Sequence, residues 1–200
     1  MTRTLQAVLL FLLLLAPGIV PAAEGDAPPD RGAPSPLITE LSVESADGQY
    51  SASFRLESAF DDEILGHIES GLETEFDYRI EVIRRRRFWL DEHILRRRVL
   101  ASTRYDSLSR QYSLVLKVDG EVERSSTTDK AEEMHRWMTE IRGIVLGPVS
   151  GFAPPGDFTV RVKADLQTRF VLLFIPWVRD TPWARIPLAP GSPDAHAPGT

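Results

Sequence analysis

The chain has 200 residues, no cysteine and a formal net charge of −6. Its length fits one domain of ordinary size, and the lack of cysteine excludes a disulfide framework and a lipid-modified cysteine anchor. The excess of acids argues against a nucleic-acid-binding protein, because such proteins present basic charge without strong competing acid.

The first residues have the pattern of a cleavable secretory signal peptide. Arg3 supplies a positive charge, residues 5–15 are almost wholly apolar, and Val20 and Ala22 fit the positions that signal peptidase reads. We expect residues 1–22 to be removed and the mature protein to be periplasmic. An uncleaved anchor is the alternative, although the apolar run is shorter than the roughly 20 residues of a membrane-spanning helix.

Composition then divides the rest of the chain into three parts. Residues 23–36 are rich in Pro, Gly and Asp and have too few apolar side chains to order themselves, so we predict a disordered linker. Residues 190–200 have the same character and are predicted to form a disordered tail. The folded domain is therefore expected to cover residues 37–189.

Alternation of apolar and polar residues with a period of two dominates this domain and predicts β-strands. Strands are expected at residues 37–43 and 50–57, and Asp119-Gly120 marks a tight hairpin turn. The six apolar residues 170–175 suit one more buried strand. The predicted inward-facing series are Phe76, Tyr78, Ile80 and Val82; Leu95, Arg97, Val99, Ala101, Thr103 and Tyr105; Tyr112, Leu114, Leu116 and Val118; and Phe158, Val160, Val162, Ala164 and Leu166.

Two segments have helical spacing instead. Asp61-Asp62 is a candidate cap for a short helix, and Asp129 with Glu132 is a candidate start for a second helix that ends near Gly143. Their predicted inward residues are Ile64, Leu65, Ile68 and Leu72 in the first, and Ala131, Met134, Met138 and Ile141 in the second. We therefore predict a mainly β fold: an antiparallel two-layer β-sandwich with two short helices.

Residues 83–99 contain seven arginines in seventeen positions, which allows three interpretations. The block could be a nucleic-acid arm, a membrane-surface patch, or two solvated strands joined by a turn and neutralised by acids of the same chain. The strand register places Arg84, Arg86 and Arg97 on the inward-facing side near the tip of a long hairpin. We name these three arginines as speculative partner- or anion-binding residues.

Candidate catalytic chemistry is scarce. The four histidines share no metal-ligand spacing, no glycine-rich phosphate loop is present, and the triplet Asp91-Glu92-His93 points its side chains in different directions on a strand or turn. We therefore predict no enzymatic activity, no catalytic residue, no metal site and no cofactor.

The segment 105–112, Tyr-Asp-Ser-Leu-Ser-Arg-Gln-Tyr, is interpreted as a structural turn between two strands. Asp106 and Ser107 are expected to bond backbone amides in the turn, and Leu108 is expected to fold back over the edge of the core. The two tyrosines are expected to bury their rings while keeping their hydroxyl groups at the rim.

Three features occur in a recognisable order: a short helix ending at residues 70–72, a strand over residues 76–87 beside Trp89, and the Tyr-Asp-x-Leu-x-x-Gln-Tyr motif at residues 105–112. In this order they resemble an uncharacterised family of exported bacterial proteins, domain of unknown function 4390. The resemblance implies a periplasmic domain of Gram-negative bacteria, with no known activity and no functional residue to carry over. Genes of such proteins often lie beside a membrane sensor kinase, which implies a signalling or envelope role.

Our hypothesis is a non-enzymatic periplasmic protein-interaction domain with a role in envelope signalling. The expected partner is an envelope protein such as a membrane sensor kinase, with no nucleic acid and no stable membrane span after signal cleavage. The alternative is a periplasmic domain that binds a small ligand, lipid or glycan, or an unrecognised hydrolase.

Overall fold

A computed structural model describes residues 34–86, 91–154, 157–168 and 178–189. The predicted signal peptide, C-terminal tail and strand over residues 170–175 lie outside these residues and remain predictions. In chain order the elements are β1 (Leu37–Ala46), β2 (Gln49–Glu57), α2 (Asp62–Glu69), β3 (Thr74–Arg84), β4 (Glu92–Asp106), β5 (Gln111–Val118), β6 (Glu121–Thr128), α3 (Ala131–Thr139), β7 (Glu140–Pro148), a 3-10 turn (Val149–Gly151), β8 (Phe158–Thr168), β9 (Val178–Asp180) and β10 (Ala184–Pro187).

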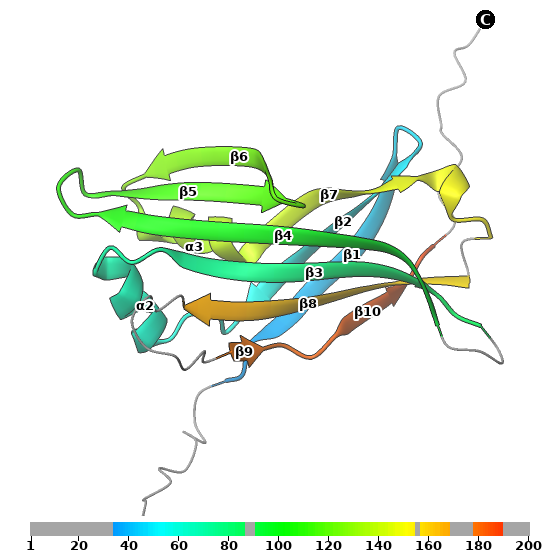
Figure 1. Ribbon diagram of the computed structural model, residues 1–200, viewed down its shortest axis with the longest axis horizontal. Coiled ribbons are helices and arrows are strands. Elements are labelled where there is room, and N and C mark those ends of the chain that lie inside the picture. Colours follow the sequence, from blue (N-terminus) through cyan, green and yellow to red (C-terminus); the bar gives the residue numbers. More distant parts are fainter. Residues whose placement is uncertain (1–33, 87–90, 155–156, 169–177, 190–200) are drawn as a thin grey trace, which may run out of the picture. The chain divides into compact units, whose positions relative to one another are not determined.

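The strands form two antiparallel sheets of unequal width, which confirms the predicted mainly β fold with two short helices (Figure 1). The small sheet has the order β1-β2-β7, and the large sheet has the order β10-β8-β3-β4-β5-β6, with β9 also pairing with β8. The large sheet packs with its inner face toward the small sheet, as in a sandwich. Among the described residues, no helix is long and apolar enough to cross a membrane.

The core lies between the two sheets and follows the predicted registers. Strand β3 supplies four fully buried side chains in alternation, from Phe76 to Val82, and β8 supplies a matching series from Phe158 to Leu166. From the small sheet, Phe54 packs against this series, and the centre of its ring lies 5.2 Å from that of Tyr78. Because alternate side chains of a strand point to opposite faces, the residues between these positions lie on the outer face of the large sheet.

Helix α2 begins as predicted. The carboxylate of Asp61 accepts a hydrogen bond from the backbone N–H of Ile64 at 2.8 Å, which satisfies one of the free donors of the first turn. Ile64 and Ile68 are buried, whereas Leu72 lies beyond the helix and is 41% exposed, so its predicted core position is wrong. The helix ends before Leu72 because the chain turns away at Gly71, whose φ is +80°.

The second helix is shorter than predicted. Asp129 does not cap α3; the N-cap position is Lys130, and the hydroxyl of Thr128 accepts from the N–H of Lys130 and donates to Glu133. Met134 and Met138 are buried as expected, but Ala131 is exposed. Ile141 is buried on strand β7 rather than on the helix, because the chain pairs with β2 from residue 140 onward.

The turn between β4 and β5 confirms part of its prediction and corrects the rest. Asp106 accepts hydrogen bonds from the N–H groups of Leu108 and Ser109, at 2.8 and 3.2 Å. Tyr105 and Tyr112 are half-buried, and their rings lie 4.8 Å apart. Leu108 is 95% exposed, so the prediction that it folds over the core is wrong. The two bonds to Asp106 hold the turn in a shape that directs Leu108 away from the domain.

We expect Tyr78→Phe to lower the free energy of unfolding by about 1–3 kcal/mol, the usual cost of an unsatisfied buried acceptor. The Tyr78 hydroxyl donates to the backbone carbonyl of Met138 at the end of α3, and burial raises the pKa of this hydroxyl well above its ordinary value, so it stays protonated. Urea unfolding would measure the loss. Tyr112→Phe, at a half-buried tyrosine, is the control and should change stability by less than about 0.5 kcal/mol. Equal stability of all three proteins would contradict the assigned bond.

We expect the domain to lose stability as the pH falls from 7.5 to 5.0, through His135 on α3. Its imidazole stacks on Phe60 at 4.2 Å, and burial lowers the pKa of His135 despite the opposing effect of Glu132. The unfolded chain therefore binds a proton first, near the unperturbed pKa of about 6.5, and becomes favoured below that pH. Unfolding free energies at both pH values should differ less in His135→Gln than in the parent protein. An equal pH dependence of stability in the parent protein and in His135→Gln would rule out His135 as the group responsible.

Candidate interaction surface

The three arginines singled out from the sequence do not form one cluster. Arg84 is the last residue of β3 and lies opposite Glu92 on β4, at the outer end of the long hairpin. Its guanidinium group lies 4.0 Å from the carboxylate of Asp157, and its central carbon lies 5.1 Å from the centre of the Phe158 ring. Arg84 therefore spreads over the end of the core, in the way expected of a long cationic side chain.

Arg86 and Arg97 also have acidic partners within the chain. Arg86 follows β3 and pairs with Glu92 across the hairpin. Arg97 lies further inward on β4, where it donates to the carboxylate of Asp119 at 2.6 Å. The three side chains are thus each matched by a carboxylate, in accord with the interpretation of an internally neutralised hairpin. Arg97 differs from the other two arginines because it also lines a groove.

The groove lies on the side of the sandwich where the large sheet extends past the small one. Arg97 donates across it to the backbone carbonyl of Val145 on β7, at 3.3 Å. The groove has a volume of about 410 Å³, and its walls come from β4, the β5–β6 hairpin and β7. Its lining residues are Arg97, Val118, Asp119, Glu121, Glu123, Gly143, Ile144 and Val145. Among the described residues, neither Glu121 nor Glu123 makes an ion pair.

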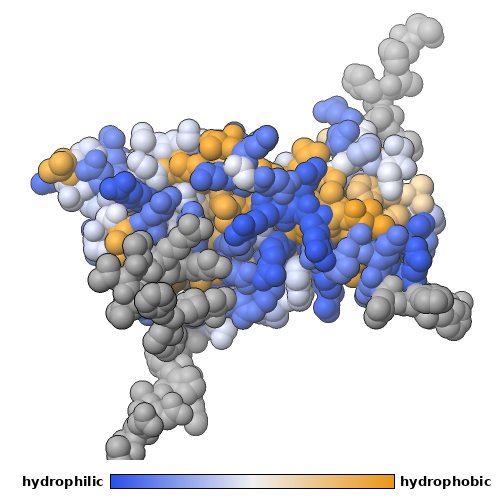
Figure 2. All heavy atoms as spheres, viewed as in Figure 1, coloured by the Kyte–Doolittle hydropathy of each residue, from blue (hydrophilic) through white to orange (hydrophobic). Residues whose placement is uncertain are grey.

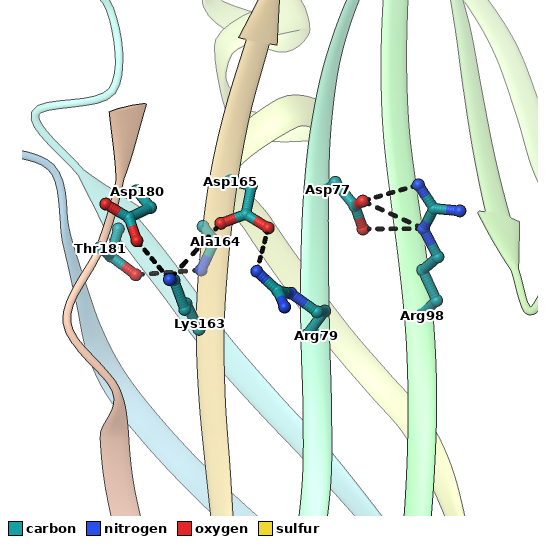
Figure 3. A network of polar contacts seen from close by, with 8 residues as sticks. All are labelled: Asp77, Arg79, Arg98, Lys163, Ala164, Asp165, Asp180 and Thr181. Carbon is teal, nitrogen blue, oxygen red and sulfur yellow. Dashed lines mark hydrogen bonds and ion pairs between the residues drawn. The ribbon is translucent and has the colours of Figure 1, made fainter. Parts of the chain in front are cut away.

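The outer face of the large sheet carries a network of ion pairs that the sequence reasoning did not identify (Figure 3). Asp77 on β3 accepts hydrogen bonds from two nitrogens of Arg98 on β4, at distances between 2.7 and 3.1 Å. On the other side of β3, Arg79 pairs with Asp165 on β8. Lys163 donates to Asp180 on β9 and lies 3.8 Å from Asp165. The network therefore joins four neighbouring strands.

A second group of charges centres on Glu81, two residues further along β3. Its carboxylate accepts from Nε of Arg161 on β8 at 2.8 Å and lies 3.3 Å from both Arg96 and His93 on β4. The guanidinium group of Arg161 also lies over the indole of Trp183, 4.4 Å from its centre. This contact places Trp183 beside the outer face, where it covers a cation.

Three carboxylates of this face are more deeply buried than the arginines that pair with two of them. Asp77, Glu81 and Asp165 are only 7%, 8% and 6% exposed, because the longer basic side chains lie over them. The side chains of Arg79 and Arg98 are 47% and 56% exposed. The hydrogen bonds from Arg98 to Asp77 raise the pKa of Arg98, and the bond from Lys163 lowers the pKa of Asp180, so both groups stay charged.

The described residues offer little for catalysis. No group of three or more His, Asp and Glu side chains in them could hold a metal ion. The predicted lack of enzymatic activity remains a prediction. The alternation of residues along β3, β4 and β8 was a sequence signal that their charges lie on the face opposite the core, but it does not give the strand order that pairs them.

The two sheets, the groove and the outer ion-pair network define a mainly β domain with the arrangement of a sandwich. The family described as "Domain of unknown function (DUF4390)" matches residues 33–171. The chain belongs to this family, and the resemblance found in the sequence is confirmed. No curated protein and no solved structure matches the chain.

We expect Asp77→Asn to lower the free energy of unfolding by about 1–3 kcal/mol, as the loss of a hydrogen bond between charged groups does. The asparagine side chain has only one oxygen that can accept hydrogen bonds from the two nitrogens of Arg98. It also lacks the negative charge, so the positive charge of Arg98 loses its partner. Denaturant unfolding would measure the change. Asp91→Asn, at an exposed residue before β4, is the matched control and should cost less than about 0.5 kcal/mol. Similar costs at both positions would show that the network contributes nothing to stability.

Proposed function

We propose that this protein is a non-enzymatic protein-interaction domain of the bacterial envelope, exported to the periplasm by its N-terminal signal. The signal-like first 22 residues support the location. Membership of a family without an assigned activity is compatible with a binding role, as is the scarcity of catalytic groups in the described residues. The partner is an envelope protein, and a membrane sensor kinase is the candidate that the family resemblance implies.

The groove at the open side of the sandwich carries this proposal. Strand β7 is an edge strand of the small sheet, and the groove runs beside it. Edge strands present unpaired backbone groups, and proteins commonly bind an extended segment of a partner along such an edge. Val145 on β7 is 50% exposed, so an apolar side chain of the partner has a surface to contact.

Arg97 indicates which chemistry the groove accepts. Its guanidinium group donates hydrogen bonds to the carboxylate of Asp119 and to the backbone carbonyl of Val145 on the edge strand. Glu121 and Glu123 lie in the same lining and could receive further cations. An extended segment with alternating basic and apolar side chains would therefore complement the groove in charge and in shape.

The groove also supports a second candidate function, the binding of a small ligand or glycan. Its volume of about 410 Å³ lies within the range of about 300–1,000 Å³ that is typical of small-molecule sites. Thermal-shift screening of envelope lipids and cell-wall fragments would test it. A ligand present at one hundred times its dissociation constant stabilises the native state by about 2.7 kcal/mol, which such a screen detects.

The main proposal is tested by recovery of cross-linked partners from periplasm. We expect Glu121→Lys combined with Val145→Lys to reduce recovery of the parent's partners at least tenfold, because like charges at an interface cost several kcal/mol. The matched control is Glu63→Lys with Leu72→Lys, which changes the net charge equally at exposed positions outside the lining of the groove. Unchanged recovery with the groove variant, or equal losses with the control, would contradict the proposal.

A further inference from the structure

The outer face of the large sheet is basic although the whole chain is acidic. The strand register places eight basic residues on this face, namely Arg79, Arg96, Arg98, Arg104, Lys117, Arg161, Lys163 and Arg185. It places six acidic residues there, namely Glu75, Asp77, Glu81, Asp106, Asp165 and Asp180. The face thus has two more bases than acids in a chain whose net charge is −6.

The potential outside this face is more positive than the count alone implies. Three of the six acids are buried beneath the arginines, whereas the side chain of Arg96 is 68% exposed. An approaching molecule therefore meets more guanidinium groups than carboxylates. Figure 2, which views this side of the domain, shows hydrophilic residues spread across the middle of the face.

Several of the cations are available to a partner. Within the described ranges, Arg104, Lys117 and Arg185 have no ion pair, and Arg104 and Arg185 are exposed. Arg98 uses Nε and one terminal nitrogen for Asp77, which leaves its other terminal nitrogen directed away from that bond. Exposed arginines on a rigid sheet are well suited to recognise carboxylates, because the guanidinium fork matches their geometry.

The face also has the composition of a protein-binding surface. Leu100 and Val115 are half-buried and lie on the outer register among the bases, and Val122 is 61% exposed beside Lys117. Interfaces between proteins combine apolar contacts with arginine in this manner. In Figure 1 no described helix crosses the middle of this face.

We propose that the outer face of the large sheet binds an acidic protein surface, with Arg96, Arg104 and Lys117 among the residues that contact its carboxylates. A protein partner fits better than a nucleic acid, because acids such as Asp180 remain on the face and would repel a continuous run of phosphates. A protein partner can instead present both acidic and basic side chains, which can face the bases and the acids of this surface. This surface is separate from the groove beside β7, so each can be tested alone.

The test uses two fluorescent probes with the whole mature protein: a 20-residue peptide of alternating Glu and Ser, and a 20-nucleotide oligothymidine. The binding variant changes Arg96, Arg104 and Lys117 to Gln. The control changes Arg110, Arg136 and Arg142 to Gln, at exposed positions that are not on this face, and alters the net charge equally. Circular dichroism and thermal unfolding check that both variants remain folded.

We expect fluorescence anisotropy at low salt to show that the parent binds the acidic peptide and that the binding variant binds it about tenfold more weakly. Loss of about 0.5 kcal/mol for each of three exposed ion pairs gives a change of that size. The control should bind within twofold of the parent, and added salt should weaken all binding. Equal losses in both variants, tighter binding of the oligothymidine, or no binding of the peptide below roughly 1 mM would each overturn the proposal.

Discussion

The unequal width of the two sheets is the constraint on which the other features depend. A three-stranded sheet cannot cover the inner face of a seven-stranded sheet, so the region under β5 and β6 needs another cover. Helix α3 supplies it, with Met134 and Met138 turned into the core and the Tyr78 hydroxyl bonded to its last turn. The helix covers only part of the gap. The remainder is the groove beside β7, and Arg97 spans it by reaching from one sheet to the backbone of the other.

In the part of the chain that the structure describes, no second layer covers the outer face of the large sheet. This face is polar, and ion pairs order its charged side chains. Buried carboxylates on β3 and β8 hold cations from the adjacent strands, and the register makes neighbours of residues that are far apart in sequence, such as Arg79 and Asp165. The free energy of any one exposed pair is small. Several ion pairs that share a carboxylate nevertheless fix the positions of the guanidinium groups. Side chains that are already fixed lose less conformational entropy when a surface binds a partner.

The strands and their inward residues could be predicted from the sequence, because alternation has one simple period and Asp119-Gly120 marks a turn. The helix ends could not be predicted as well, since Thr128 competes with Asp129 for the cap and β7 takes up the residues after Thr139. Leu108 was placed wrongly because hydrophobicity alone does not determine direction in a turn whose shape Asp106 sets. The acid partners of Arg79 and Arg161 depend on β8 pairing with β3, and strand order cannot be read from local periodicity.

Strand β6 is an open edge of the large sheet with a strongly polar composition. All of its residues except Thr128 are exposed, and its sequence, Glu-Val-Glu-Arg-Ser-Ser-Thr-Thr, contains a single aliphatic side chain. A second copy that paired with this edge would gain backbone hydrogen bonds but would bury almost no apolar area. Self-association through this edge would therefore gain little beyond the backbone hydrogen bonds.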